Sequence, residues 1–385
     1  MEEQTADSDK PLGELLVLVD SNPPAEIVPE ISGPSCSTLY GVYWSIDIGE
    51  NEAFVLHQEE KVQLFDRQFR EFPEVNDMPE VFEGQFMHDD AKLYSKTWTP
   101  DGPVVAKLVF VHGFSEHINR YNEFFPKFAD NGIQVFGWDQ RGWGQSVHRR
   151  VDRGLTGPTS QVVGDVAAFI RGKLPCRTDT ATVPLFVMGH SMGGGEILIL
   201  AGMSEYADLV SQVRGWILEC PFVGFPAGEE PSGLKMFAGR LIGRFLPRQQ
   251  LKHVVPPEYL SRDEAVVKAV RNDPLCHNTG TLEGLASLLD RTTLLSSGTF
   301  TVGKQVRSIL LAHGTKDKAC SLDAAVALVQ SQHSVHDKST KLYAGAYHQL
   351  HADLCKDQFT NDVIDWILER SSNAKIAADT RDAKL

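Results

Sequence analysis

Short, almost continuously apolar segments alternate with helical patterns along the chain from Val81 onward. Each apolar segment is bounded by turn residues and is too short for a buried helix, which is typical of strands covered on both faces. The expected strands are 106–113, 133–139, 184–189, 215–219 and 307–314, and the expected helices lie near 120–131, 161–172, 191–204, 321–331 and 358–370. This alternation predicts an α/β fold with a mostly parallel central sheet flanked by helices, preceded by two paired strands in FEGQF and KLYSKTW.

One long interruption separates the last two of these five strands. Residues from about 222 to 300 exceed a normal crossover connection, and we predict that they form a helical cap over the site. Within them, the segment LKMFAGRLIGRFLPR (234–248) places apolar residues on one side of a helical wheel and Arg240, Arg244 and Arg248 on the other. Two interpretations stay open: a helix that buries its apolar side against the core, or an interfacial helix whose basic residues meet anionic head groups.

The negative charge of the chain is concentrated at its N-terminal end. The 385 residues carry a net charge of −14, and residues 1–80, with 18 acidic and 4 basic side chains, account for all of it. We expect 1–80 to be an acidic, partly disordered extension, 81–372 to be the folded domain, and 373–385 to be a polar tail. The neutral domain shows no basic stripe, so we expect no nucleic-acid partner.

Targeting signals are weak or absent in the sequence. The first residues, MEEQTADSDKP, have neither the basic start nor the apolar core of a secretory signal, and no run approaches the roughly 20 apolar residues of a membrane span. The 6 scattered cysteines fit free thiols better than disulfides or a zinc site. We expect a cytoplasmic protein, with the peroxisome as the alternative because the chain ends in AKL (383–385), one residue away from the S-K-L address.

The motif GHSMG (189–193) places Ser191 between two glycines, directly after an expected strand. In a nucleophile elbow this turn is so tight that a Cβ at either glycine would collide with neighbouring backbone. The motif alone is weak evidence, since a chain of this length contains it by chance roughly one time in eight. The alternative is a serine at a tight helix start with no catalytic role.

Two more reactive side chains follow expected strands. Asp317 follows RSILLAHGTK, and His348 follows the strand-like KLYAGAY. The carboxyl ends of parallel strands meet at one edge of a sheet, and serine, aspartate, histidine is the chain order of α/β-hydrolase triads, so we expect Ser191, Asp317 and His348 to form one. Two alternatives stay open: Asp317 could cap the helix SLDAAVALV, and His351 competes with His348 for the role of base.

Each predicted residue has a chemical role. His348 would take the proton of Ser191 and later protonate the leaving alcohol, while Asp317 would hold the imidazole tautomer and stabilise its charged form. The tetrahedral intermediate needs hydrogen-bond donors, and the backbone N–H groups of Phe114 and Met192 are expected to supply this oxyanion hole. This chemistry requires no metal and no organic cofactor, so we expect neither.

The motifs as a set resemble those of one enzyme family. They are HGFSEHINRY (112–121), WDQRGWGQS (138–146), GHSMGGG, LSRDEAVVKAVRNDPL (260–275), HGTKDKAC and GAYHQLH. Over roughly residues 82–370 the chain resembles monoacylglycerol lipases of the α/β-hydrolase superfamily, most closely the fungal type. The resemblance implies the α/β-hydrolase fold, the triad and oxyanion donors named above, and a serine lipase that cleaves monoacylglycerol to fatty acid and glycerol through an acyl-enzyme.

The resemblance also implies roles around the triad. Glu116, Arg120 and His351 match polar positions that such lipases place near the glycerol end of the pocket, whereas Glu116 and Arg120, four residues apart, could instead form only a local ion pair. The amphipathic cap of these lipases docks on membranes, which implies a membrane or lipid-droplet surface as a partner. Trp143, where relatives commonly have histidine, and the bulky Phe114 depart from the pattern and affect the expected shape of the pocket.

Other functions fit the same residues. A carboxylesterase, a lysophospholipase or an acyltransferase could use the same fold and triad. A catalytically silent homologue that binds lipid or a protein partner is the alternative from another class, although such proteins usually lose a triad residue or an elbow glycine. Cys320, three residues after the predicted acid, is expected near the triad, with a buried and unreactive thiol as the favoured interpretation.

Overall fold

The described part of the chain builds one large sheet with helices on both faces. A computed structural model describes residues 79–174, 183–229 and 242–382. Within them, an 8-stranded sheet has the order β1-β2-β4-β3-β5-β6-β9-β10, and β7 pairs with β8 separately. The strands are β1 (Glu80–His88), β2 (Ala91–Thr99), β3 (Ala106–Val111), β4 (Ile133–Trp138), β5 (Leu185–His190), β6 (Val213–Glu219), β7 (Gln250–Lys252), β8 (Thr279–Thr281), β9 (Ser308–Gly314) and β10 (Asp337–Tyr343). The expected extension 1–80, apart from its last two residues, and the AKL end lie outside the described residues.

Strand directions confirm the expected α/β-hydrolase architecture. The pairs β3–β4, β3–β5, β5–β6, β6–β9 and β9–β10 are all parallel. At one edge, β1 and β2 form an antiparallel hairpin, and β2 pairs antiparallel with β4. This hairpin contains the two strands expected in FEGQF and KLYSKTW.

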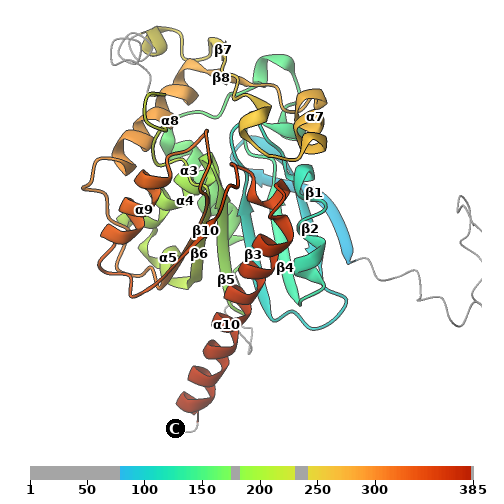
Figure 1. The fold of residues 1–385 in the computed structure, drawn as a ribbon, viewed down its shortest axis with the longest axis vertical. Coiled ribbons are helices and arrows are strands. Elements are labelled where there is room, and N and C mark those ends of the chain that lie inside the picture. The colour runs from blue at the N-terminus through green and yellow to red at the C-terminus, as the bar shows by residue number, and fades with distance from the viewer. Residues whose placement is uncertain (1–78, 175–182, 230–241, 383–385) are drawn as a thin grey trace, which may run out of the picture. The chain divides into compact units, whose positions relative to one another are not determined.

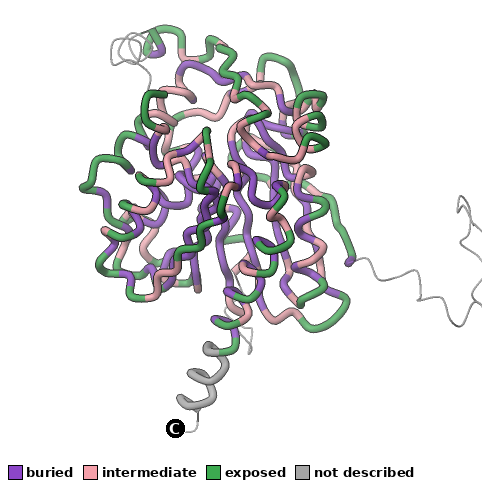
Figure 2. The backbone as a smooth tube through the Cα atoms, viewed as in Figure 1, coloured by how far each residue is buried: buried purple, intermediate pink, exposed green. Residues whose placement is uncertain are grey.

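Alternate residues of each central strand enter two separate hydrophobic cores. In β3, Val109 and Val111 belong to the first core, whereas Leu108 and Phe110 belong to the second. Successive side chains of a strand point to opposite faces, so a strand covered on both faces must be apolar at nearly every position. This double coverage explains the continuous apolar runs in the sequence, and Figure 2 shows the central strands buried along their length.

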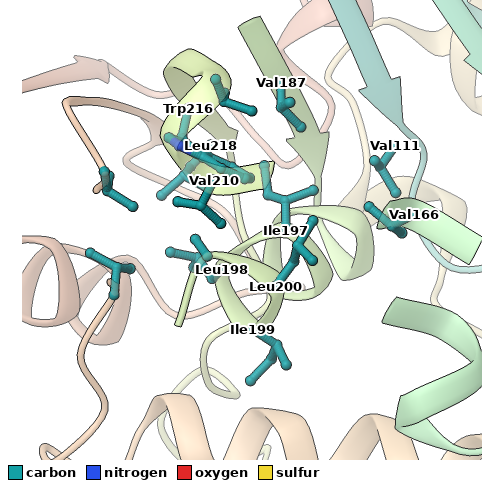
Figure 3. Packing of buried hydrophobic residues seen from close by; sticks show 14 of the residues in the cluster. Val111, Val166, Val187, Ile197, Leu198, Ile199, Leu200, Val210, Trp216 and Leu218 are labelled. Carbon is teal, nitrogen blue, oxygen red and sulfur yellow. The ribbon is translucent and has the colours of Figure 1, made fainter. Parts of the chain in front are cut away.

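Two groups of helices supply the outer walls of these cores. On one face lie α3 (Thr159–Arg171), α4 (Met192–Gly202), α5 (Ala207–Gln212), α8 (Leu282–Leu295) and α9 (Leu322–Ser331), and on the other lie α2 (Pro126–Ala129) and α10 (Lys356–Asp382). Short 3-10 helices cover Ile118–Tyr121, Gly144–Ser146, Arg150–Asp152, Ser204–Tyr206, Pro257–Tyr259 and Leu350–Ala352. In Figure 3, Ile197 and Leu200 of α4 pack in the first core with Val187 of β5 and Leu218 of β6.

The helix expected over 120–131 was wrong as one element. The structure has the 3-10 helix Ile118–Tyr121 followed by the short helix α2. Pro126 lies in the first turn of α2, where its missing N–H is harmless, but it could not continue a helix begun at residue 120.

The last strand and the last helix also differ from expectation. KLYAGAY (341–347) was predicted as a strand, but β10 ends at Tyr343, opposite Gly314 at the end of β9. The chain then turns at Gly345, whose φ of +72° favours glycine. Helix α10 continues to Asp382, within the segment expected to be a tail.

The long insertion between β6 and β9 contains β7, α7 (Glu264–Asn272), β8 and α8. Figure 1 shows β7, β8 and α7 together at one end of the sheet. Helix α8 contacts α3 and α4, and its Leu295 belongs to the first core, so this helix is part of the layer that covers the sheet.

Only the end of the amphipathic segment 234–248 lies within the described residues. Residues 242–245 are helical there, and the side chains of Ile242, Phe245 and Leu246 are exposed. In this described part the apolar side chains are not buried against the core, and the interfacial role of the segment stays a prediction. None of the helices that the structure describes combines the length and apolar character needed to cross a membrane.

The stability of the α10 side of the sheet depends on Phe359. Its ring is fully buried and stacks on Phe124 with centroids 5.6 Å apart. Phe359→Ala is expected to lower the free energy of unfolding by about 3–5 kcal/mol, because it removes apolar contacts and leaves a cavity. Urea unfolding followed by tryptophan fluorescence measures this. Phe82→Ala, at an edge-strand side chain that is 67% exposed, is the control and should change stability by less than about 0.5 kcal/mol.

Candidate active site

Ser191 occupies a strained turn between β5 and α4. Its backbone has φ +53° and ψ −116°, a region that non-glycine residues rarely adopt. The neighbouring strand end holds it there: the Ser191 N–H donates to the Glu219 carbonyl at 2.9 Å, and the Phe222 N–H donates to the Ser191 carbonyl at 2.8 Å. The serine is therefore fixed by β6 as well as by its own turn, which argues against an ordinary helix-start serine.

Both glycines of the motif are required by close backbone contacts. A Cβ at Gly189 would overlap the carbonyl of Gly193, and a Cβ at Gly193 would overlap the carbonyl of Val111 in β3. The first contact is the tight turn itself, and the second is the packing of that turn against the neighbouring strand. The structure therefore confirms the steric reason given for the motif.

His348 and Asp317 meet at the ends of β9 and β10. His348 Nδ1 lies 2.8 Å from Asp317 Oδ2, and both side chains are buried. The other oxygen, Oδ1, accepts the N–H groups of Ala319 at 2.7 Å and Cys320 at 3.0 Å. The helix cap considered for Asp317 is instead Ser321, whose side chain accepts from the third residue of α9.

This pair favours the charged imidazole. Burial is the largest single influence on each side chain and by itself disfavours charge. The attraction between the two charges and their hydrogen bond outweigh it, so the pKa of Asp317 falls to about 2 and the pKa of His348 rises well above 6.5. Asp317 is thus placed to stabilise the imidazolium that forms when His348 takes a proton.

Two buried thiols lie beside the His348 imidazole. Cys320 Sγ is 3.9 Å from Ser191 Oγ and also contacts His348, so the serine and the histidine lie against the same thiol. Cys220 has its Sγ within 4.8 Å of ligand atoms of Asp317 and His348. Burial raises the pKa of both thiols, which therefore stay protonated at neutral pH. Cys320 lies near the predicted triad, as expected.

The loop after β3 carries the predicted oxyanion donor Phe114. The N–H of Gly113, directly before Phe114, donates to Glu116 Oε2 at 3.0 Å and fixes the start of this loop. Met192 is the first residue of α4, where an N–H has no acceptor within the helix. Phe114 and Met192 remain the predicted pair of donors.

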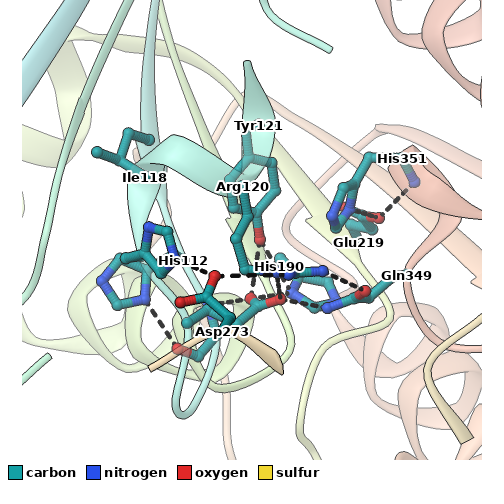
Figure 4. Close-up of polar contacts among 12 residues, drawn as sticks. His112, Ile118, Arg120, Tyr121, His190, Glu219, Asp273, Gln349 and His351 are labelled. Carbon is teal, nitrogen blue, oxygen red and sulfur yellow. Dashed lines mark hydrogen bonds and ion pairs between the residues drawn. The ribbon is translucent and has the colours of Figure 1, made fainter. Parts of the chain in front are cut away.

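Glu116 is the centre of a buried polar network that includes Tyr121, His190 and Gln349 (Figure 4). Its Oε2 also accepts the Tyr121 hydroxyl at 2.8 Å and lies 2.9 Å from His190 Nδ1, while Oε1 contacts the Gln349 amide. Burial would raise the pKa of Glu116, but electrostatic attraction and a hydrogen bond from His190, with further attraction from His351 and Arg120, hold that pKa well below its usual value. The carboxylate thus joins the oxyanion loop to the residue before Ser191.

Arg120 and His351, the other two residues predicted at the glycerol end of the pocket, also interact with side chains of the protein itself. Arg120 Nε lies 3.9 Å from Glu116 Oε1, which matches the local ion pair considered for these residues. His351 is buried, and its Nδ1 lies 2.7 Å from Glu219 Oε1. It does not contact Asp317, which favours His348 as the base. Contact of Glu116, Arg120 or His351 with substrate stays a prediction.

Sequence reasoning missed Glu219. Its backbone carbonyl holds Ser191, and its side chain accepts both the N–H and the ring of His351, three residues after His348. A signal was present, because a carboxylate that ends the buried strand GWILE is unusual in an apolar run. His190 and Gln349 were missed for a different reason: their partners are distant in sequence.

Three buried or half-buried clusters bring possible metal ligands within 4.8 Å of one another. They are His117–Asp273–Cys276, His190–Glu219–His351 and Cys220–Asp317–His348. Each contains a histidine and a carboxylate that are already hydrogen-bonded, and this pairing accounts for their proximity.

Comparison with known proteins agrees with this geometry. A family described as serine aminopeptidase, S33, matches residues 102–354. A monoglyceride lipase of Mus musculus is 30% identical over 295 residues, which cover 74% of this chain and 90% of that protein. The chain belongs to the monoglyceride lipase family. A monoacylglycerol lipase of Mycolicibacterium smegmatis is 29% identical over 72% of this chain and 93% of that protein.

Solved structures agree on the fold. A soluble variant of monoglyceride lipase from Saccharomyces cerevisiae, in complex with a substrate analogue, aligns with TM-score 0.65 and 20% identity over 78% of this chain and 99% of that chain. Membership of the monoglyceride lipase family makes the chain an ester-hydrolysing serine hydrolase.

Within the family pattern, the two bulky departures pack on each other. The rings of Phe114 and Trp143 meet edge to face with centroids 4.8 Å apart, and Trp143 stacks on His277 at 5.0 Å. Trp143 is buried, so these aromatic contacts pack Phe114 of the oxyanion loop against the interior of the domain.

The role of Asp317 predicts a change in pH dependence. The active base is neutral His348, and Asp317 favours the charged form, so the rising limb of kcat/KM should lie above pH 6.5. In Asp317→Asn the pKa of His348 falls, so this limb should move to lower pH while the rate drops by roughly 10⁴-fold. Initial rates on a soluble ester from pH 5 to 10 measure both. An unmoved limb would contradict the assignment of Asp317 as the acid.

Proposed function

We propose that the chain hydrolyses monoacylglycerol to a fatty acid and glycerol through an acyl-enzyme on Ser191. The observation that carries the proposal is the strained serine beside the hydrogen-bonded His348–Asp317 pair, at the carboxyl edge of the parallel sheet. The names of the monoglyceride lipases that cover most of the chain support the choice of substrate.

In the first half of the reaction, His348 Nε2 takes the proton of Ser191 as its Oγ attacks the ester carbonyl carbon. The carbonyl oxygen becomes an oxyanion, which the N–H groups of Phe114 and Met192 stabilise. The bond from the carbonyl carbon to the glycerol oxygen then breaks, and His348 returns the proton to that oxygen. Glycerol leaves, and the acyl group remains on Ser191.

In the second half, water replaces glycerol. His348 takes a proton from the water as its oxygen attacks the acyl carbon, and the same two N–H groups stabilise the second oxyanion. The bond from the acyl carbon to Ser191 Oγ breaks, and the proton returns to the serine as the fatty acid leaves. Asp317 stays ionised throughout, in keeping with its lowered pKa.

Loss of the nucleophile tests this proposal. Ser191→Ala should abolish hydrolysis of 1-oleoylglycerol, with a fall of at least about 10³-fold, because no acyl-enzyme can form. Fatty acid release measured by titration, with far-UV circular dichroism as the control for folding, gives the result. A folded Ser191→Ala protein with near-normal activity would refute the mechanism.

A substrate panel separates the alternatives. Dioleoylglycerol, oleoyl lysophosphatidylcholine, p-nitrophenyl butyrate and leucine p-nitroanilide can be compared with 1-oleoylglycerol on the same protein. Preference for the lysophospholipid, for the short ester or for the anilide would replace the lipase with a lysophospholipase, a carboxylesterase or a peptidase. Absence of any turnover and of labelling by a fluorophosphonate would favour the silent homologue.

We further propose that the cap docks on a lipid surface. The stretch 242–254 exposes Ile242, Phe245, Leu246, Leu251 and Val254, with Phe245 78% exposed. In the same stretch, Arg244, Arg248 and Lys252 are exposed, and such pairing of apolar and basic side chains suits an anionic lipid surface.

A paired substitution tests the docking surface. Phe245→Ser should weaken sedimentation with vesicles of phosphatidylserine and phosphatidylcholine by about tenfold, because a large apolar side chain no longer enters the lipid. Turnover of soluble p-nitrophenyl butyrate should stay unchanged. Phe82→Ser, at an exposed phenylalanine of β1, is the matched control, and equal losses in both variants would contradict a role of the cap.

A further inference from the structure

Ser115, in the oxyanion loop, adopts a backbone conformation that serine rarely takes. Its φ is +56°, and the residue is buried. Glycine enters this left-handed region without a steric penalty, whereas a side chain with a Cβ is disfavoured there. The feature that serine adds at this position is its hydroxyl group.

The hydroxyl of Ser115 binds the cap. Its Oγ accepts the backbone N–H of Asn278 at 2.7 Å. Asn278 directly precedes β8, and its own carbonyl accepts the N–H of His253, directly after β7, at 2.9 Å. The contact therefore joins the oxyanion loop to the end of the β7–β8 ribbon.

The β7–β8 ribbon is itself anchored to the domain. The N–H and the Oγ1 of Thr281 in β8 both donate to the carbonyl of Gly154, at 3.2 Å and 3.1 Å. A second contact reaches the loop, because the rings of His253 and Phe114 meet edge to face with centroids 5.8 Å apart. The ribbon thus connects a fixed point of the domain to the loop.

Four consecutive residues of the loop are held from two sides. Gly113 and Glu116 bind each other and, through Glu116, the buried network with His190. Phe114 and Ser115 contact the ribbon. The N–H of Phe114 lies between these two attachments, so its direction depends on both.

We propose that Ser115 is a positioning residue whose hydroxyl ties the β7–β8 ribbon to the oxyanion loop and thereby holds the N–H of Phe114 toward the reacting carbonyl. The inference rests on the proposed function, because Phe114 is the oxyanion donor there. It also makes the cap a part of the catalytic geometry, beyond its contact with lipid.

Two substitutions of Ser115 distinguish the effect of losing its hydroxyl from the effect of relieving its backbone strain. Ser115→Ala keeps the Cβ in the left-handed region, Ser115→Gly relieves it, and both remove the hydroxyl. Both should lower kcat for p-nitrophenyl butyrate by about tenfold, with KM within about twofold, since a displaced donor costs less than the 10²–10³ of a deleted one. The inhibition constant of a trifluoromethyl ketone, whose adduct with Ser191 places an oxyanion in the same hole, should rise by a similar factor.

A control variant removes a hydroxyl elsewhere in the domain. Ser146→Ala removes a buried hydroxyl that donates to the Asp139 carbonyl at 2.6 Å and accepts the Tyr94 N–H at 2.9 Å, away from the loop. It should lower the thermal midpoint and leave both kcat and the inhibition constant unchanged.

The outcomes separate this inference from the proposed function. Wild-type kcat in Ser115→Gly, or equal losses in Ser146→Ala, would overturn the positioning role in a working enzyme. A wild-type protein that cleaves p-nitrophenyl butyrate and ignores monoacylglycerol would remove the proposed substrate while the Ser115 comparison still decides the positioning role. A wild-type protein that cleaves neither ester would overturn both.

Discussion

The left-handed backbone of Ser191 is the constraint on which the catalytic edge depends. A serine does not hold this conformation by itself, because its Cβ is disfavoured there. Hydrogen bonds to Glu219 and Phe222 hold the turn from one neighbouring strand, and the contact of Gly193 with Val111 holds it from the other. The parallel sheet therefore provides a rigid frame that holds Ser191 in its strained conformation.

Next to this turn, the interior of the protein contains buried, hydrogen-bonded polar side chains in place of a hydrophobic core. The carboxylates of Glu116 and Glu219 are fully buried and are held ionised by neighbouring histidines. Burying a charge is costly unless it is paired and hydrogen-bonded, so each carboxylate imposes a definite position on its partners. Glu116 positions the oxyanion loop and His190, and Glu219 positions the segment that follows His348. A hydrophobic core could fill this space, but it could not direct these groups.

The architecture was predictable because it depends on local patterns. Strands buried on both faces are apolar at nearly every position, and the glycines beside Ser191 are required by a turn of known geometry. The strand before His348 was predicted too far along the chain. The segment KLYAGAY stays apolar after Tyr343, although pairing with β9 ends at that residue. The helix at 120–131 was overextended because Pro126 was not treated as a start signal.

The supporting residues of the site could not be predicted in the same way. Ser115 and Asn278 are 163 positions apart, and Glu219 and His351 are 132 apart. No periodicity or motif connects such pairs, since their contact arises only when the sheet brings distant loops together. Of these residues, only Glu219 is noticeable in the sequence, because it is a charged residue at the end of the otherwise apolar strand GWILE.

Glu219 has a consequence for how such a chain can diversify. The cap begins within a few residues of this glutamate, yet the bonds from it to Ser191 and His351 lie on the sheet side of the junction. Insertions and replacements in most of the cap can therefore reshape the entrance without disturbing the nucleophile or the base. Three parts of the insertion are exceptions. The ribbon that ends at Asn278 reaches back to the catalytic loop, the carbonyl of Leu260 accepts the N–H of Gln349 next to His348, and α8 belongs to the layer that covers the sheet. Lineages that exchange caps on this frame would have to preserve these contacts, or replace them, while other parts of the cap vary.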